Sequence, residues 1–204
     1  NCFFVYTQFL KCILDTGNIV ALRKFIERKT YFFNYKLSYK HNICADLCFY
    51  LKKNVTQNLL SINDICAQYD LLIPYIIKNK LHTSFVSEIE EIVNELVVYK
   101  DIYKLFKIFD KHELLVDYNI IDSSGFPVLA DCLKYGCINT LRYLLDKPSL
   151  EIKNDIYVEP QKDLIECSFY NFNYNVSKTF LNFVKRNNCF TYTFDKYSVR
   201  NLIN

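Results

Sequence analysis

Apolar side chains recur every three or four residues along most of the chain, which is the spacing of one face of an α-helix. Stretch 3–14 shows this pattern first, and stretch 19–26 repeats it with Arg and Lys at the polar positions. Between them, Thr16-Gly17-Asn18 supplies a helix end followed by a good N-cap residue. The two stretches therefore predict a helical hairpin.

Ten further stretches show helical spacing and are joined by short connections. Several connections hold capping or helix-stopping residues, such as Asn63-Asp64, Pro127 and Lys147-Pro148. The segment Leu150–Pro160 is instead typical of a loop or a short β-hairpin. The predicted helices are 41–53, 62–69, 71–80, 86–99, 101–111, 127–135, 138–147, 161–170, 176–187 and 195–203.

Composition supports a helical fold. The 204 residues include only 3 Gly and 4 Pro, whereas sandwiches and barrels need many turn residues. A hydrophobic fraction of 51% is enough for a substantial core. We expect one elongated, all-α domain, an α-solenoid of ankyrin-like or HEAT-like hairpins. It would comprise an N-terminal helical-hairpin region, 1–120, and a C-terminal helical region, 121–204.

Two segments of the chain resemble each other. Residues 17–26 (GNIVALRKFI) and 136–145 (GCINTLRYLL) each have a Gly that ends one helix and an Ile/Leu stripe that opens the next. The second is preceded by Asp122-Ser-Ser-Gly125 and Pro127, so residues 122–147 predict one ankyrin-like unit. The spacing of the two copies is not a whole number of ankyrin periods, and a full ankyrin array is not expected.

The cysteines do not form a disulfide pattern. There are 9, an odd number, and several lie among apolar helical positions, where a thiol acts as a small hydrophobic group. Those placed in this way are Cys12, Cys44, Cys48, Cys132 and Cys167. We expect the thiols to stay reduced.

No stretch of the sequence predicts a membrane span. The longest apolar run, Leu71–Ile77, contains Pro74 and is too short to cross a bilayer. A cytosolic or nuclear protein is therefore favoured, and cytoplasmic localisation is the prediction.

No catalytic motif is present. Three isolated glycines form neither a phosphate-binding loop nor a nucleophile elbow. The acidic group Glu88, Glu90, Glu91 and Glu95 opens an amphipathic helix, where it suits the helix dipole better than acid–base chemistry. We therefore expect no enzymatic activity, no cofactor and no small-molecule substrate.

A metal site is the weaker interpretation of one cysteine group. His41, Cys44 and Cys48 have helical spacing, with Cys66 as a fourth zinc ligand. The chain has no C-x-x-C pair, however, and buried cysteines on a helix explain the same spacing. The prediction is therefore that no metal is bound.

The small net charge of +3 is unevenly distributed. Residues 23–53 hold eight basic and two acidic side chains, and 178–204 hold five and one, whereas 88–122 are acidic. Aromatic residues alternate with bases in 28–41 and 185–192, a pattern that stacks RNA bases while Lys and Arg hold phosphates. Solvated helix faces and ordinary aromatic packing are the alternatives. The candidate nucleic-acid-binding residues are Arg23, Lys24, Arg28, Lys29, Lys36, Lys40, Lys52, Lys53, Lys185, Arg186, Lys196 and Arg200.

A family resemblance covers roughly residues 5–112. The segments that carry it are 9–14, 22–26, 43–51, 70–80 and 103–109. In these apolar helices the chain resembles the C-terminal helical domain of the Mic-one-like proteins, which belong to the Mon–Ccz exchange complex. The chain is also small, of this helical type and rich in the residues that AT-rich codons encode. In these respects it is similar to the microsporidian dormancy factors, which occupy the exit-tRNA region of the small ribosomal subunit.

The second resemblance implies a ribosome-binding hibernation factor that contacts rRNA and ribosomal proteins and blocks a tRNA site without catalysis. The alternative is a protein–protein adaptor, such as a subunit of an endolysosomal Rab exchange complex or a viral-type ankyrin protein. We expect no membrane insertion in either case.

Overall fold

The protein is helical throughout the part of the chain that can be described. The computed structural model describes residues 2–28, 43–121, 127–151, 164–169 and 172–187. In these ranges the regular secondary structure is α-helix, apart from one isolated antiparallel bridge between Ile121 and Pro127. The all-α prediction is confirmed for these ranges. The chain divides into two compact units, Asn1–Asp117 and Tyr118–Asn204.

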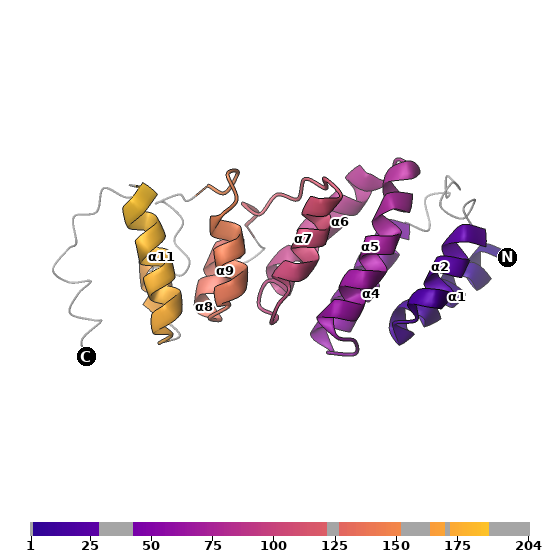
Figure 1. Ribbon diagram of the computed structural model, residues 1–204, viewed down its shortest axis with the longest axis horizontal. Coiled ribbons are helices and arrows are strands. Elements are labelled where there is room, and N and C mark those ends of the chain that lie inside the picture. Colours follow the sequence, from indigo (N-terminus) through magenta and orange to yellow (C-terminus); the bar gives the residue numbers. More distant parts are fainter. Residues whose placement is uncertain (1, 29–42, 122–126, 152–163, 170–171, 188–204) are drawn as a thin grey trace. The chain divides into compact units, whose positions relative to one another are not determined.

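The helices of the first unit form two rows. The first row contains α1, α4 and α6, in which α4 packs against both of the others; in the second row α5 packs against both α2 and α7. The helices of the unit lie side by side (Figure 1). Their bounds are α1 Cys2–Thr16, α2 Ile19–Arg28, α4 Ile43–Thr56, α5 Ile62–Lys78, α6 His82–Leu96 and α7 Tyr103–Lys111.

Aromatic side chains join three helices of this unit. Tyr69 on α5 stacks on Phe85 of α6, and Phe85 meets Phe109 of α7 edge to face, each with ring centroids 6.2 Å apart. The hydroxyl of buried Tyr69 donates to the carbonyl of Leu47 on α4 at 2.6 Å. Such ring pairs stabilise a core beyond simple area burial. The cluster therefore links both rows.

Buried amides anchor the first hairpin to the second. The carbonyl of Leu14, near the end of α1, accepts from Asn54 Nδ2 at 3.2 Å and from Gln68 Nε2 at 3.0 Å. Both amides are buried, on α4 and α5 respectively. Carbonyls in the last turn of a helix have no partner within that helix, and the N–H of Gly17 reaches this one only over 3.4 Å. The two buried amides therefore complete its hydrogen bonding.

Helix α5 corrects one prediction. A break between 62–69 and 71–80 was expected, but α5 is continuous through Pro74. Ser61 caps its start by accepting from the backbone N–H of Asp64 at 3.2 Å. Pro74 is exposed, whereas Ile73 before it and Ile76 after it are buried. Tertiary packing on both sides of the proline outweighs the one backbone hydrogen bond that it removes.

The second unit repeats the two-row arrangement in smaller form. Helix α8 packs against α9 and α10, and α11 packs against α9 and α10. The bounds are α8 Val128–Lys134, α9 Ile138–Leu145, α10 Leu164–Phe169 and α11 Tyr174–Asn187. The predicted helix 195–203 and residues 152–160 of the predicted loop lie outside the described residues.

The two similar segments have the same local structure. Gly17 and Gly136 both adopt the left-handed conformation, with φ of 67° and 72°. Each donates its N–H over 3.4 Å to the carbonyl three residues earlier, Leu14 and Leu133. Six apolar residues were predicted to be buried, and all six are: Leu22, Phe25, Ile26, Leu141, Leu144 and Leu145. The turn Asp122–Gly125 of the predicted ankyrin-like unit lies outside the described residues.

Candidate nucleic-acid interface

Helix α2 presents a basic outer face. Leu22, Phe25 and Ile26 point into the core, which leaves Arg23, Lys24 and Arg28 on the exposed side. The helix begins after Asn18, whose side-chain oxygen accepts from the N–H of Ala21 at 2.9 Å. Because the apolar stripe sets the rotation of the helix, the sequence itself directs these cations outward. Figure 1 shows α2 in the outermost hairpin of its unit.

The three cations of α2 make no ion pair within the described part of the chain. The only acidic side chain in the helix is Glu27, which is also exposed. Unpaired cations on a rigid helix can approach a phosphate backbone without first breaking a protein salt bridge. We call Arg23, Lys24 and Arg28 the α2 basic face.

Lys52 and Lys53 are in a different situation from the α2 basic face. Lys52 Nζ lies 2.6 Å from Glu95 Oε1 of α6, and Lys53 Nζ lies 3.1 Å from Asp15 Oδ1 of α1. Both lysines are half-buried. Their charges join α4 to the neighbouring helices of its row, so each is balanced within the protein.

Helix α11 of the second unit carries the other described candidates. Lys185 and Arg186 are exposed in its last turn, where positive charge also offsets the helix dipole. Lys178 Nζ lies 5.4 Å from the ring centroid of Tyr174. The sequence of α11 contains no acidic residue, which makes it a second basic helix.

The remaining candidates lie outside the described residues. They are Lys29, Lys36, Lys40, Lys196 and Arg200, and the aromatic residues of 31–39 lie outside as well. The structure also places one lysine close to two aromatic rings, which the sequence did not predict. Lys147 Nζ lies 4.5 Å from the ring centroid of Tyr143 and 5.8 Å from that of Tyr118. The sequence offered little indication of this contact, because Tyr118 is distant in sequence from Tyr143 and Lys147.

Most of the described cysteines lie in the interior of the protein. Cys44, Cys48, Cys132 and Cys167 are buried, but Cys12 is exposed, so its predicted place in the core was wrong. Burial, with a smaller effect of Glu88, raises the pKa of Cys44 to about 12. No cluster of three or more potential ligands occurs among the described residues, and His41 lies outside them. Thiols with raised pKa stay protonated and unreactive at neutral pH.

The carboxylates of the acidic helix α6 contact neighbouring segments. Burial, and next the charge of Glu91, raises the pKa of Glu88, but that side chain is only half-buried. Glu90 accepts from the backbone N–H of Asp117 at 2.9 Å, and Glu95 forms the ion pair with α4. Glu90 and Glu95 therefore join α6 to neighbouring segments.

One carboxylate bridges α5 and α7. Asp70 lies 2.7 Å from Lys111 Nζ and 2.7 Å from His112 Nε2. Hydrogen bonding from Lys111 is the main cause that lowers the pKa of Asp70, supported by His112 and opposed by partial burial. His112 therefore has an acidic partner that the sequence did not reveal, because the two residues are far apart along the chain.

Comparison of the chain with protein-family models, with curated proteins and with solved structures finds no match. In the part of the chain that the structure describes, none of the helices combines the length and the apolar character needed to cross a bilayer.

Proposed function

We propose that this protein is a non-catalytic, ribosome-binding hibernation factor that contacts rRNA and occupies the exit-tRNA region of the small subunit. The α2 basic face is the observation that carries the proposal. It places Arg23, Lys24 and Arg28 on one exposed helix surface, with no ion pair to a described residue. Such a surface attracts phosphates by charge and by release of counterions. The family resemblance supplies the ribosome as the RNA partner.

The arrangement of helices supports an extended binding scaffold. Within each unit, successive helices pack in two rows, and we infer that this represents an α-solenoid of the HEAT or ankyrin type. Solenoids bind large partners along their rows of helices and need no deep active site. A blocking function requires only that the bound protein fill space that tRNA would occupy.

Co-sedimentation with purified microsporidian ribosomes tests the proposal. The parent chain should bind, and added deacylated tRNA should displace it. Changing Arg23, Lys24 and Arg28 together to Glu should weaken binding at least about tenfold and lower the slope of log affinity against log salt by about 3. Helicity, measured by circular dichroism, should not change because these side chains are exposed.

The matched control changes Lys78, Lys80 and Lys107 to Glu. These lysines are exposed in the same unit but lie off α2, and the substitution changes the net charge by the same amount. Binding that falls equally in both variants would show a nonspecific charge effect. A parent chain that does not sediment with ribosomes, or one that deacylated tRNA leaves in place, would contradict the proposed function.

A protein–protein adaptor is the second candidate. Phe9 on α1 and Phe49 on α4 are 53% and 61% exposed, and Val5 on α1 is also exposed. Since α1 and α4 pack together in the first row, these apolar groups belong to one pair of helices. Exposed apolar side chains of this kind favour contact with another protein. This function would survive charge reversal on α2.

A further inference from the structure

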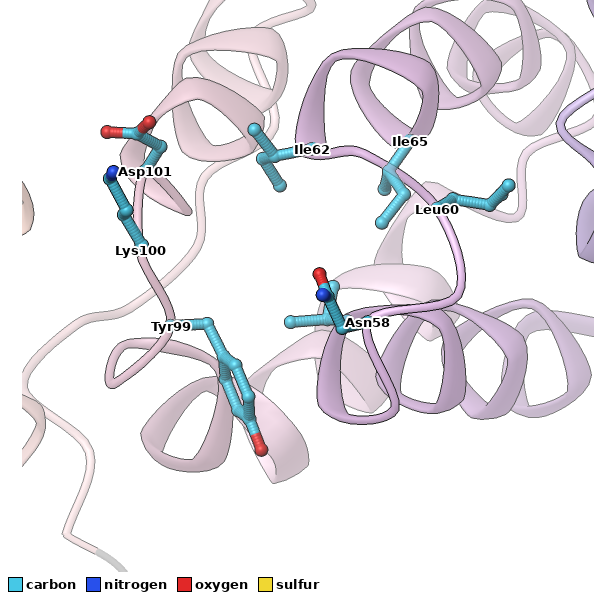
Figure 2. A pocket seen from close by; sticks show the side chains of 8 residues that line it. Asn58, Leu60, Ile62, Ile65, Tyr99, Lys100 and Asp101 are labelled. Atoms are coloured by element: carbon cyan, nitrogen blue, oxygen red, sulfur yellow. The ribbon is translucent and has the colours of Figure 1, made fainter.

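A pocket lies at one edge of the first unit. It has a volume of about 300 Å³ and is formed where the connection between α4 and α5 meets the connection between α6 and α7. Val55, Ile62 and Ile65 provide aliphatic walls, while Asn58, Tyr99 and Lys100 add polar groups. In Figure 2, the Asn58 amide lies across the open space from Ile62 and Ile65. The volume is at the small end of the range of about 300–1,000 Å³ for ligand sites.

The lining matches a flat ring that also has hydrogen-bonding edges. Aliphatic and aromatic side chains contact the faces of a nucleobase, and a side-chain amide offers a donor and an acceptor next to each other for its edge. Asn58 is exposed, and its side chain makes no hydrogen bond to another described residue. Its amide is therefore available to a ligand at the mouth of the pocket.

The charges at the rim suit a phosphate. Lys100 is exposed and forms no ion pair within the described residues. The carboxylate of Asp101, on the same rim, lies 3.6 Å from Lys104 Nζ, which offsets its negative charge. A nucleotide has its anionic phosphate beside its base, so it would match an aliphatic pocket with a free cation at the edge.

The pocket adjoins the start of α2. Leu60, which also lines the pocket, contacts Gly17 so closely that an added Cβ would lie 3.1 Å from Leu60 Cδ2. Gly17 directly precedes Asn18 and the first turn of α2. The pocket and the start of α2 therefore share one edge of the unit, and a strand on the α2 basic face would have to extend past the start of α2 to reach the pocket.

We propose that this pocket binds one unstacked base of single-stranded RNA, with Asn58 at the base edge, Tyr99 beside the ring and Lys100 on the adjacent phosphate. This inference rests on the proposed function, because it assigns the base contact of the same RNA-binding surface. A peptide with an apolar side chain next to a carboxylate is the competing occupant.

Fluorescence anisotropy with two labelled oligonucleotides tests the pocket separately from the ribosome. One is an octamer of single-stranded RNA, and the other has the same backbone with abasic sites. The parent chain should bind the first about tenfold more tightly, as expected for one stacked base. Asn58→Gly and Tyr99→Leu should each reduce this preference and leave abasic binding unchanged. Gly is used at position 58 because φ there is 51°.

The charge-reversed α2 variant separates the two proposals. It should lose affinity for both oligonucleotides while retaining the preference for bases. Equal binding of both oligonucleotides by the parent would overturn the pocket assignment, even if ribosome binding persisted. If the protein preferred bases but did not bind ribosomes, the pocket assignment would be supported and the proposed function would be contradicted. If the protein bound neither oligonucleotide, the pocket assignment would be contradicted as well.

A blocked variant tests the competing occupant. Ile62→Trp should fill the pocket and abolish the base preference of the parent. If instead the parent showed no base preference but bound peptides containing Leu-Asp or Phe-Glu, and Ile62→Trp lost that binding, the pocket would be a peptide site. That result would overturn the nucleobase assignment.

Discussion

Hairpin α1/α2 of the first unit and hairpin α8/α9 of the second share a local design but present different surfaces. Both turn at a left-handed glycine, and both bury the same three positions of the following helix. Their exposed positions differ, because α2 carries three basic residues and α9 only Arg142. Equivalent packing therefore does not imply equivalent surface charge. Apolar positions specify the hairpin, while the polar positions remain free to vary.

The anchoring of the two hairpins also differs. The end of α1 is held by the buried amides of Asn54 and Gln68. Asn18 gives α2 a side-chain cap, whereas Cys137 at the corresponding position of α9 makes no such bond. Side-chain capping typically contributes about 0.5–2 kcal/mol. The first hairpin therefore has polar restraints in addition to its apolar core.

The largest expected effect comes from the shared core position. Leu22 and Leu141 are both fully buried, and replacing either with Ala should lower the free energy of unfolding of its own unit by about 2–5 kcal/mol. Hydrogen exchange read by mass spectrometry would locate the loss in the first or the second unit. Ala21→Gly, at a half-buried position, is the milder control. A loss below that of the control would show that the shared stripe is not the core of its hairpin.

The two glycines should give a smaller effect. Gly17→Ala and Gly136→Ala each force a side chain into the left-handed region, which costs about 1–2 kcal/mol. Gly17→Ala must also displace Leu60. Thermal unfolding of both variants measures the loss. Gly136→Asn should be less damaging than Gly136→Ala, because Asn tolerates this conformation. Equal stability of Gly136→Ala and the parent would contradict the need for glycine.

The smallest expected effect is the pH-dependent contribution of Asp70 to the stability of the first unit. The folded pKa of Asp70 is lowered, mainly by its bond with Lys111, so the stabilisation is present above the unfolded value of about 3.9 and is lost as pH falls through the folded pKa. The advantage of the parent over Asp70→Asn should be below about 1 kcal/mol at pH 7, because the pair is partly exposed.

Urea unfolding at pH 7 and pH 3 measures this difference. The gap between parent and Asp70→Asn should shrink at pH 3, and hydrogen exchange should assign it to the first unit. Glu27→Gln, an exposed carboxylate on α2, is the matched control and should show a much smaller gap. A gap that is equal at both pH values would mean that the charge of Asp70 does not stabilise the fold.

The helical hairpins and the buried side of each of their helices could be predicted from the sequence without tertiary information. The period of the apolar residues predicted both similar hairpins and their buried leucines, because a helix whose apolar stripe faces the core must place its remaining residues outside. The exposure of Arg23, Lys24 and Arg28 follows from the same reasoning. These properties depend on neighbours within one or two helical turns.

Other features depend on which helices meet. Nothing local distinguishes Lys52 from Lys24, yet Lys52 pairs with Glu95 from a helix 43 positions away in sequence. A helix break at position 70 was predicted, but Tyr69 and Leu72 on either side of it are buried and α5 is continuous. The pocket at Asn58 and Tyr99 exists only because two connections adjoin. Helical periodicity determined which side of each helix is buried. Tertiary packing decided the ion pairs, the continuity of α5 and the pocket, because each requires side chains from separate helices to come within a few ångströms.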